Sequence, residues 1–193
     1  MDHQIAMKAA IAEAERARGD TGDNPWVGSV IVIGDQIVAR GHTQGPGEDH
    51  AEIGALRQAS AAGVDLSRAT LYSTLEPCSF HGRTPACANV IARSGVARVV
   101  TGIRDPNPRV DGQGAAIVRA AGIEVIEDVC AEEIRRQLGG WIFRYHPHEP
   151  TRRACTMTAL PEQEIARALV QLYAVAPDLA AAVVRAARAS LPA

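Results

Sequence analysis

The chain has 193 residues, of which 47% are hydrophobic and 22% are charged, and its formal net charge is −2. This length fits one domain of ordinary size, with enough apolar side chains to form a core without disulfides. The arginines are spread along the chain, which argues against a nucleic-acid-binding protein. No apolar run reaches the length of a membrane span and no signal peptide is visible, so we expect a cytoplasmic protein that does not bind a membrane.

The predicted elements begin with an alanine-rich amphipathic helix over residues 3–18, which Gly19 ends. Two β-branched runs follow, and Gly34-Asp35 between them is typical of an antiparallel hairpin. Strands and helices then alternate. The full set of expected strands is 27–33, 36–40, 69–75, 97–101 and 123–126, and the later helices are 51–59, 86–93, 114–121 and 131–143. The alternation predicts an α/β protein with a mostly parallel sheet and covering helices.

The organisation changes after residue 146. We expect residues 1–146 to form one domain, whereas the Pro- and His-containing segment that follows has the composition of a linker. The remainder of residues 147–193 is alanine-rich and predicts a short helical C-terminal extension, too short for a second catalytic domain. We expect this extension to pack on the domain or on a neighbouring subunit.

Three potential metal ligands lie in two segments of the chain. His50 stands two residues before Glu52, and Cys78 and Cys87 follow at and beyond the end of a predicted strand. A structural zinc site usually has four protein ligands, so one histidine and two cysteines predict Zn²⁺ with one position open for water. Both segments open helices, whose N-termini favour thiolate over thiol.

Glu52 has the chemistry of a proton carrier beside such a site. Zinc lowers the pKa of its water toward neutrality, and a nearby carboxylate can take a proton and deliver it elsewhere. The set predicts hydrolytic removal of an amino group from a heterocycle. Other interpretations are ordinary buried cysteines with a capping histidine, a non-catalytic zinc-stabilised binding module, and a metal-free binding protein. Cys130 and Cys155 are expected to be free thiols.

The segment Thr74–Cys87 and the motifs Asn24-Pro25-Trp26-Val27-Gly28 and Asp105-Pro106-Asn107-Pro108 resemble the deaminase domain of the riboflavin-biosynthesis deaminase/reductase family. Eight residues separate Cys78 from Cys87, which is typical of this branch of the cytidine-deaminase-like superfamily. The resemblance covers about residues 3–145. It implies a three-layer α/β/α fold with a mixed, mostly parallel five-stranded sheet, and a homodimer or homotetramer.

The resemblance also implies a substrate, 2,5-diamino-6-ribosylamino-4(3H)-pyrimidinone 5′-phosphate, which is deaminated to the 5-aminouracil product. In this assignment Asn24 contacts the pyrimidine. Arg83 binds the phosphate, as arginine does well with two parallel hydrogen bonds. Asp105 and Asn107 bind the ribose or phosphate end. From composition alone, Asn24-Pro25 and Asp-Pro-Asn-Pro are also simply turns.

Two positions depart from the pattern of the family. Thr43 and Phe80 stand where the family has histidines. His42 and His81, each one residue away, are therefore candidates for the substrate contacts of those histidines, and Thr43 itself is also kept as a candidate substrate-binding residue. The chain has no Gly-rich dinucleotide motif, so a separate protein would have to carry out the reduction if the pathway runs in this organism. Alternative substrates are another aminated pyrimidine, a pteridine or a nucleoside, including one from a riboflavin-like secondary-metabolite pathway.

Overall fold

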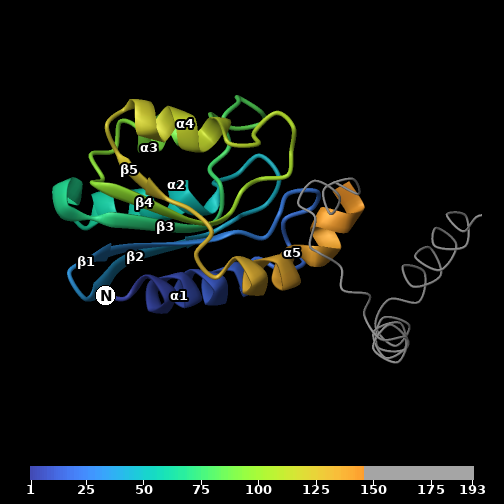
Figure 1. The fold of residues 1–193 in the computed structure, drawn as a ribbon, viewed down its shortest axis with the longest axis horizontal. Coiled ribbons are helices and arrows are strands. Elements are labelled where there is room, and N and C mark those ends of the chain that lie inside the picture. Colours follow the sequence, from blue (N-terminus) through green and yellow to red (C-terminus); the bar gives the residue numbers. More distant parts are fainter. Residues whose placement is uncertain (146–193) are drawn as a thin grey trace, which may run out of the picture. The chain divides into compact units, whose positions relative to one another are not determined.

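The computed structural model describes residues 1–145, so the expected linker and C-terminal extension over 147–193 lie outside the described residues. Five strands form one sheet in the order β2-β1-β3-β4-β5 (Figure 1). Strand β1 pairs antiparallel with both β2 and β3, whereas β3, β4 and β5 pair in parallel. The strands are β1 (Gly28–Ile33), β2 (Gln36–His42), β3 (Thr70–Leu75), β4 (Arg98–Ile103) and β5 (Glu124–Ile126). The sheet is therefore mixed, as expected.

Helices cover both faces of this sheet and confirm the three layers. Figure 1 shows α1 and α5 on one face and α2, α3 and α4 on the other. Their bounds are α1 (His3–Glu15), α2 (Ala51–Ala61), α3 (Cys87–Ile91), α4 (Gln113–Ala120) and α5 (Ala131–Tyr145), with a short 3-10 turn η1 (Leu66–Arg68) before β3. Helix α1 ends three residues earlier than predicted, and α3 is shorter than the predicted helix over 86–93.

The alternation of side chains along the strands builds two cores. Ile31, Leu71 and Val99 pack among α2, α3 and α4, while their chain neighbours Tyr72 and Val100 pack against α1 and α5. Successive strand residues point to opposite faces, so a strand buried on both faces reads as a continuous apolar run. This arrangement explains why the strands were visible in the sequence.

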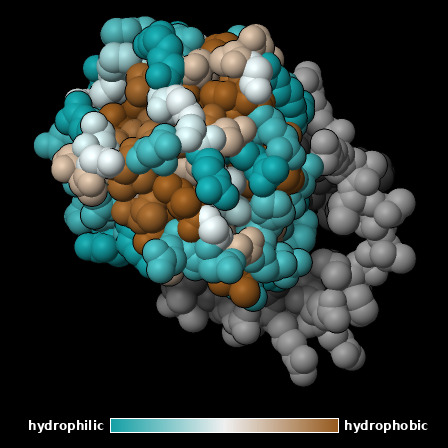
Figure 2. Space-filling model, turned by 90° about the vertical axis from the view of Figure 1, so that its left-hand side faces the viewer, coloured by the Kyte–Doolittle hydropathy of each residue, from teal (hydrophilic) through white to brown (hydrophobic). Residues whose placement is uncertain are grey.

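Figure 2 views the end of the molecule that carries the β1–β2 turn, and it shows hydrophobic residues interspersed with hydrophilic ones. Among the described residues, Ile5 is the large hydrophobic side chain that is mostly exposed, at 61%. Within residues 1–145, no helix combines the length and the apolar character needed to cross a bilayer.

Two glycines set the distance between helices and sheet near the site. A Cβ on Gly41 would lie 2.2 Å from the carbonyl oxygen of Ala51, and one on Gly28 would lie 2.0 Å from that of Ala10. Only a residue without a side chain allows so close an approach. Gly41 therefore lets the first turn of α2 rest directly on β2, and this contact positions His50 and Glu52.

Candidate active site

Four chain segments meet at one edge of the sheet. Strands β3 and β4 are parallel and end there, with Leu75 opposite Ile103. The antiparallel β1 begins at the same edge, where Gly28 pairs with His42 near the end of β2. The loops around residues 23–27, 43–50, 76–87 and 104–112 therefore lie together, at the strand ends where open α/β sheets commonly bind ligands.

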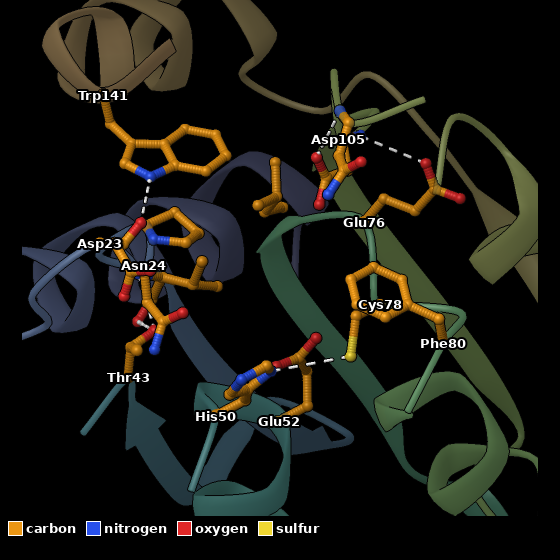
Figure 3. A pocket seen from close by; sticks show the side chains of 14 residues that line it. Asp23, Asn24, Thr43, His50, Glu52, Glu76, Cys78, Phe80, Asp105 and Trp141 are labelled. Carbon is orange, nitrogen blue, oxygen red and sulfur yellow. Dashed lines mark hydrogen bonds between the residues drawn. The ribbon is translucent and has the colours of Figure 1, made fainter. Parts of the chain in front are cut away.

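These loops enclose a cavity of about 320 Å³. In Figure 3, His50 and Glu52 lie on one side, Cys78 and Phe80 face them from the loop after β3, and Trp141 of α5 stands at the opposite end. The cavity is lined by Asp23, Asn24, Pro25, Val27, Thr43, His50, Glu52, Leu75, Glu76, Cys78, Phe80, Asp105, Asn107 and Trp141.

The structure brings His50, Cys78 and Cys87 together, with their potential ligand atoms all within 4.8 Å of one another. The Nδ1 atom of His50 lies 3.7 Å from the sulfur of Cys78 and 3.3 Å from that of Cys87. His50 precedes the first turn of α2 without capping it, and Cys87 opens α3. The Nε2 atom of His50 lies 3.5 Å from the Thr84 hydroxyl oxygen, which is the kind of contact that orients a ligating imidazole.

The spacing of these three side chains fits zinc. With ordinary Zn–S and Zn–N bond lengths, a tetrahedral site separates sulfur from nitrogen by about 3.6 Å. The chemistry fits as well, because hydrogen bonds from Cys87 and from His50 lower the pKa of the Cys78 thiol to about 4. The hydrogen bond to Cys78 and burial raise the pKa of Cys87, since a second thiolate would be repelled by the first. A divalent cation between the sulfurs would remove that repulsion.

Glu52 is buried in the first turn of α2, with 4% of its surface exposed. Burial raises the pKa of its carboxyl group to about 7, against the opposing effect of His50. A carboxyl group with a pKa near neutrality both accepts and donates protons readily. Glu52 lines the cavity beside His50, where it can exchange protons with a bound molecule.

Four of the predicted substrate residues line the cavity, namely Asn24, Thr43, Asp105 and Asn107. The Thr43 hydroxyl accepts a hydrogen bond of 3.1 Å from the backbone N–H of Val27, which fixes its orientation. Asp105 is buried and its carboxylate accepts a bond of 2.8 Å from the backbone N–H of Asn107. Burial raises the pKa of Asp105 to about 7, and the neighbouring acidic groups act in the same direction.

The other three predicted residues do not line the cavity. The Nδ1 atom of His42 lies 3.6 Å from a carboxylate oxygen of Glu13 in α1. Successive residues of a strand point to opposite faces, so His42 faces α1 while its neighbour Thr43 lines the cavity. His81 is exposed in the loop between the two ligand cysteines. Arg83, in the same loop, forms two hydrogen bonds of 2.7 and 3.0 Å with the carboxylate of Asp23.

Glu76 is a buried residue of the site that the sequence analysis missed. It is 3% exposed, and its carboxylate accepts hydrogen bonds from the backbone N–H groups of Asp105 (3.2 Å), Gly112 (3.0 Å) and Ala115 (3.0 Å). It therefore ties the loop after β4 and the first turn of α4 to the end of β3. Its position in the Glu-Pro-Cys segment, directly after a buried strand, was the available signal.

Trp141 and Asp23 were also missed. The Trp141 indole N–H donates a 3.0 Å hydrogen bond to the backbone oxygen of Asp23, and both residues line the cavity. Nothing local in the sequence connects α5 to a loop more than a hundred residues away, so only the fold reveals this contact.

This fold, with a histidine, two cysteines and a buried glutamate at one sheet edge, defines a deaminase domain of the cytidine-deaminase-like class. Residues 1–103 match the family model for the cytidine and deoxycytidylate deaminase zinc-binding region. The chain belongs to this family. The matched residues include all three potential metal ligands and Glu52.

Comparison with known proteins places the chain near one branch of the class. It is 46% identical over 143 residues to the riboflavin biosynthesis protein RibD of Aquifex aeolicus, covering 74% of this chain and 39% of that protein. It is 44% identical over 144 residues to RibD of Escherichia coli, covering 75% and 38%. The chain thus spans about two fifths of the length of these relatives.

A solved structure gives the same picture. The diaminohydroxyphosphoribosylaminopyrimidine deaminase/5-amino-6-(5-phosphoribosylamino)uracil reductase of Thermotoga maritima is 42% identical and superimposes with a TM-score of 0.68. The match covers 72% of this chain and 40% of that one. The similarity therefore confirms the predicted fold and the resemblance to the riboflavin deaminase family.

Proposed function

We propose that the protein is a zinc-dependent deaminase of 2,5-diamino-6-ribosylamino-4(3H)-pyrimidinone 5′-phosphate, which releases ammonia in a step of riboflavin biosynthesis. The observation that carries the proposal is the buried Glu52 beside His50 and Cys78 in a cavity of heterocycle size, with Cys87 grouped with these two potential metal ligands. The RibD relatives, whose deaminase region this chain matches, support the choice of substrate.

In this proposal His50, Cys78 and Cys87 hold the metal, which supplies Lewis-acid activation of water near neutral pH. Glu52 takes a proton from the attacking water as the C–O bond forms and passes it to the ring nitrogen next to the amine-bearing carbon. It then takes the second proton of that oxygen as the carbonyl forms and delivers it to the amino group, so that the C–N bond breaks and ammonia leaves. Its raised pKa suits both transfers.

The remaining lining residues bind and orient the substrate. Asn24 and Thr43 lie across the cavity from Cys78 (Figure 3). In this proposal they present polar groups to the ring from that side. Asp105 and Asn107 contact the ribose. Phe80 and Trp141 supply apolar walls that exclude water from the ring. We also propose that the protein forms a homodimer or homotetramer, which sedimentation analysis would test.

The test is Glu52→Gln, assayed for ammonia release and for bound zinc. We expect zinc to be retained and turnover to fall by about 10²- to 10⁴-fold, the usual effect of losing a general acid–base. Glu132→Gln is the matched control, because that side chain is 83% exposed and lies on α5. Wild-type turnover of cytidine or guanine far above that of the diaminopyrimidine ribotide would refute the substrate, and a fully active zinc-loaded Glu52→Gln protein would refute the role of Glu52.

A further inference from the structure

The cavity is rich in acidic groups. Within the described part of the chain, no lysine or arginine lines it, whereas four lining residues carry carboxyl groups, namely Asp23, Glu52, Glu76 and Asp105. A phosphate ester carries a charge of about −1.5 to −2 at neutral pH and needs a cation or a set of N–H donors to be bound. No lysine or arginine of the lining can serve, so any such side chain that binds the phosphate of the substrate stands just outside the lining.

Arg83 is already paired. Its guanidinium forms two parallel hydrogen bonds with the Asp23 carboxylate, the geometry that arginine would otherwise offer to a phosphate. Asp23 lies on the cavity side of this pair and Arg83 does not line the cavity. An incoming phosphate would have to displace a carboxylate to reach this guanidinium.

Arg109 is held next to the lining by three contacts. Its guanidinium carbon lies 3.8 Å from the centroid of the Phe80 ring, and Phe80 lines the cavity. Its backbone N–H donates a 3.0 Å hydrogen bond to Oδ1 of Asn107, and its backbone oxygen accepts one of 2.8 Å from the Ser79 hydroxyl. The loop after β4 and the loop after β3 therefore fix this residue together.

The guanidinium of Arg109 is available to an anion. The side chain is exposed, and no carboxylate among residues 1–145 lies within 4 Å of it as an ion-pair partner. Stacking on an aromatic ring uses the face of the guanidinium and leaves its five N–H donors, which lie in the plane, for other partners. Phe80 thus orients a cation beside the cavity without neutralising it.

We propose that Arg109, stacked on Phe80, binds the phosphate of the substrate and determines the preference for a phosphorylated substrate. This inference rests on the proposed function. It assigns to Arg109 the contact that the sequence resemblance assigned to Arg83, and it gives Phe80 the role of holding the guanidinium in place.

The experiment compares the diaminopyrimidine ribotide with its dephosphorylated riboside in the full-length, zinc-loaded protein. Arg109→Ala should lower kcat/KM for the ribotide by about 10- to 100-fold, mainly through KM, and leave the riboside unchanged. Arg109→Lys should restore part of the loss because it keeps the charge. Arg68→Ala is the matched control, since Arg68 is exposed in η1 at the other end of β3.

A binding measurement makes the outcome independent of turnover. Calorimetry with ribose 5-phosphate and with ribose should show that Arg109→Ala weakens only the phosphate-bearing sugar, by a similar factor. Unchanged binding of ribose 5-phosphate by Arg109→Ala, or a loss seen only in Arg83→Ala, would overturn the inference. Failure of the proposed function would look different, because the wild-type protein would then release no ammonia from the ribotide.

Discussion

Glu76 offers a sharp test of how the site is held together. Its carboxylate accepts hydrogen bonds from three backbone N–H groups of the loop after β4 and of α4, and two of these bonds are buried. Glu76→Ala leaves these donors without an acceptor, and each buried unsatisfied donor costs about 1–3 kcal/mol. Because the substitution also relieves the burial of a charged group, we expect a net loss of about 2–5 kcal/mol in the free energy of unfolding.

Glu76→Gln refines this test through the geometry of the two oxygens. Oε2 accepts from Asp105 and Gly112, and Oε1 accepts from Ala115. A glutamine can keep its single oxygen toward the first pair and lose only the third bond, so we expect a smaller loss of about 1–3 kcal/mol. This variant should fold and bind zinc, but with a raised KM because Asp105 and Asn107 are less firmly placed.

The assay is urea denaturation of the zinc-loaded protein, together with zinc analysis and steady-state kinetics. Glu124→Ala is the control, because that exposed side chain pairs with Arg98 at the surface and its loss should change stability by less than about 0.5 kcal/mol. A Glu76→Ala protein as stable as the wild type, or a Glu76→Gln protein less stable than Glu76→Ala, would refute the reasoning from counted donors.

Three further predictions concern the same region. The pKa of Asp105 is raised to about 7 in the folded state, so the unfolded chain loses this proton first and the stability of the protein falls as pH rises from about 4 to 7. Asp105→Asn should therefore be more stable than the wild type at pH 8, by on the order of 4 kcal/mol, and the difference should vanish near pH 4 in denaturation measured across pH. Gly114→Ala should destabilise by about 3 kcal/mol in the same assay, because its Cβ would lie 1.9 Å from the carbonyl oxygen of Pro77, whereas Gly139→Ala, which meets nothing within 4 Å, should be neutral or stabilising. Removing zinc with a chelator should expose the two ligand cysteines to a thiol reagent, and an unchanged thiol titre would contradict metal binding by these residues.

The order of helices and strands was predictable because the apolar runs of the strands and the periodicity of the helices are local signals. Strand β4, for example, is buried on both faces, with Val99 in one core and Val100 in the other, and so reads as a continuous apolar segment. The hairpin was visible in Gly34-Asp35. The insertion of β1 between β2 and β3 was not visible, because strand order depends on which edges pair in three dimensions.

The sequence by itself determined the chemistry proposed for the site, since metal ligands and a proton carrier must be particular residue types at restricted spacings, and His50, Glu52, Cys78 and Cys87 meet that requirement. Only the tertiary structure decided what surrounds them. It paired Arg83 with Asp23, placed Arg109 on Phe80, and made Glu76 the acceptor for three N–H groups of a distant loop and of the helix that follows it. Such contacts join segments that are far apart in the chain, and their energies depend on distances that no local pattern of residues encodes.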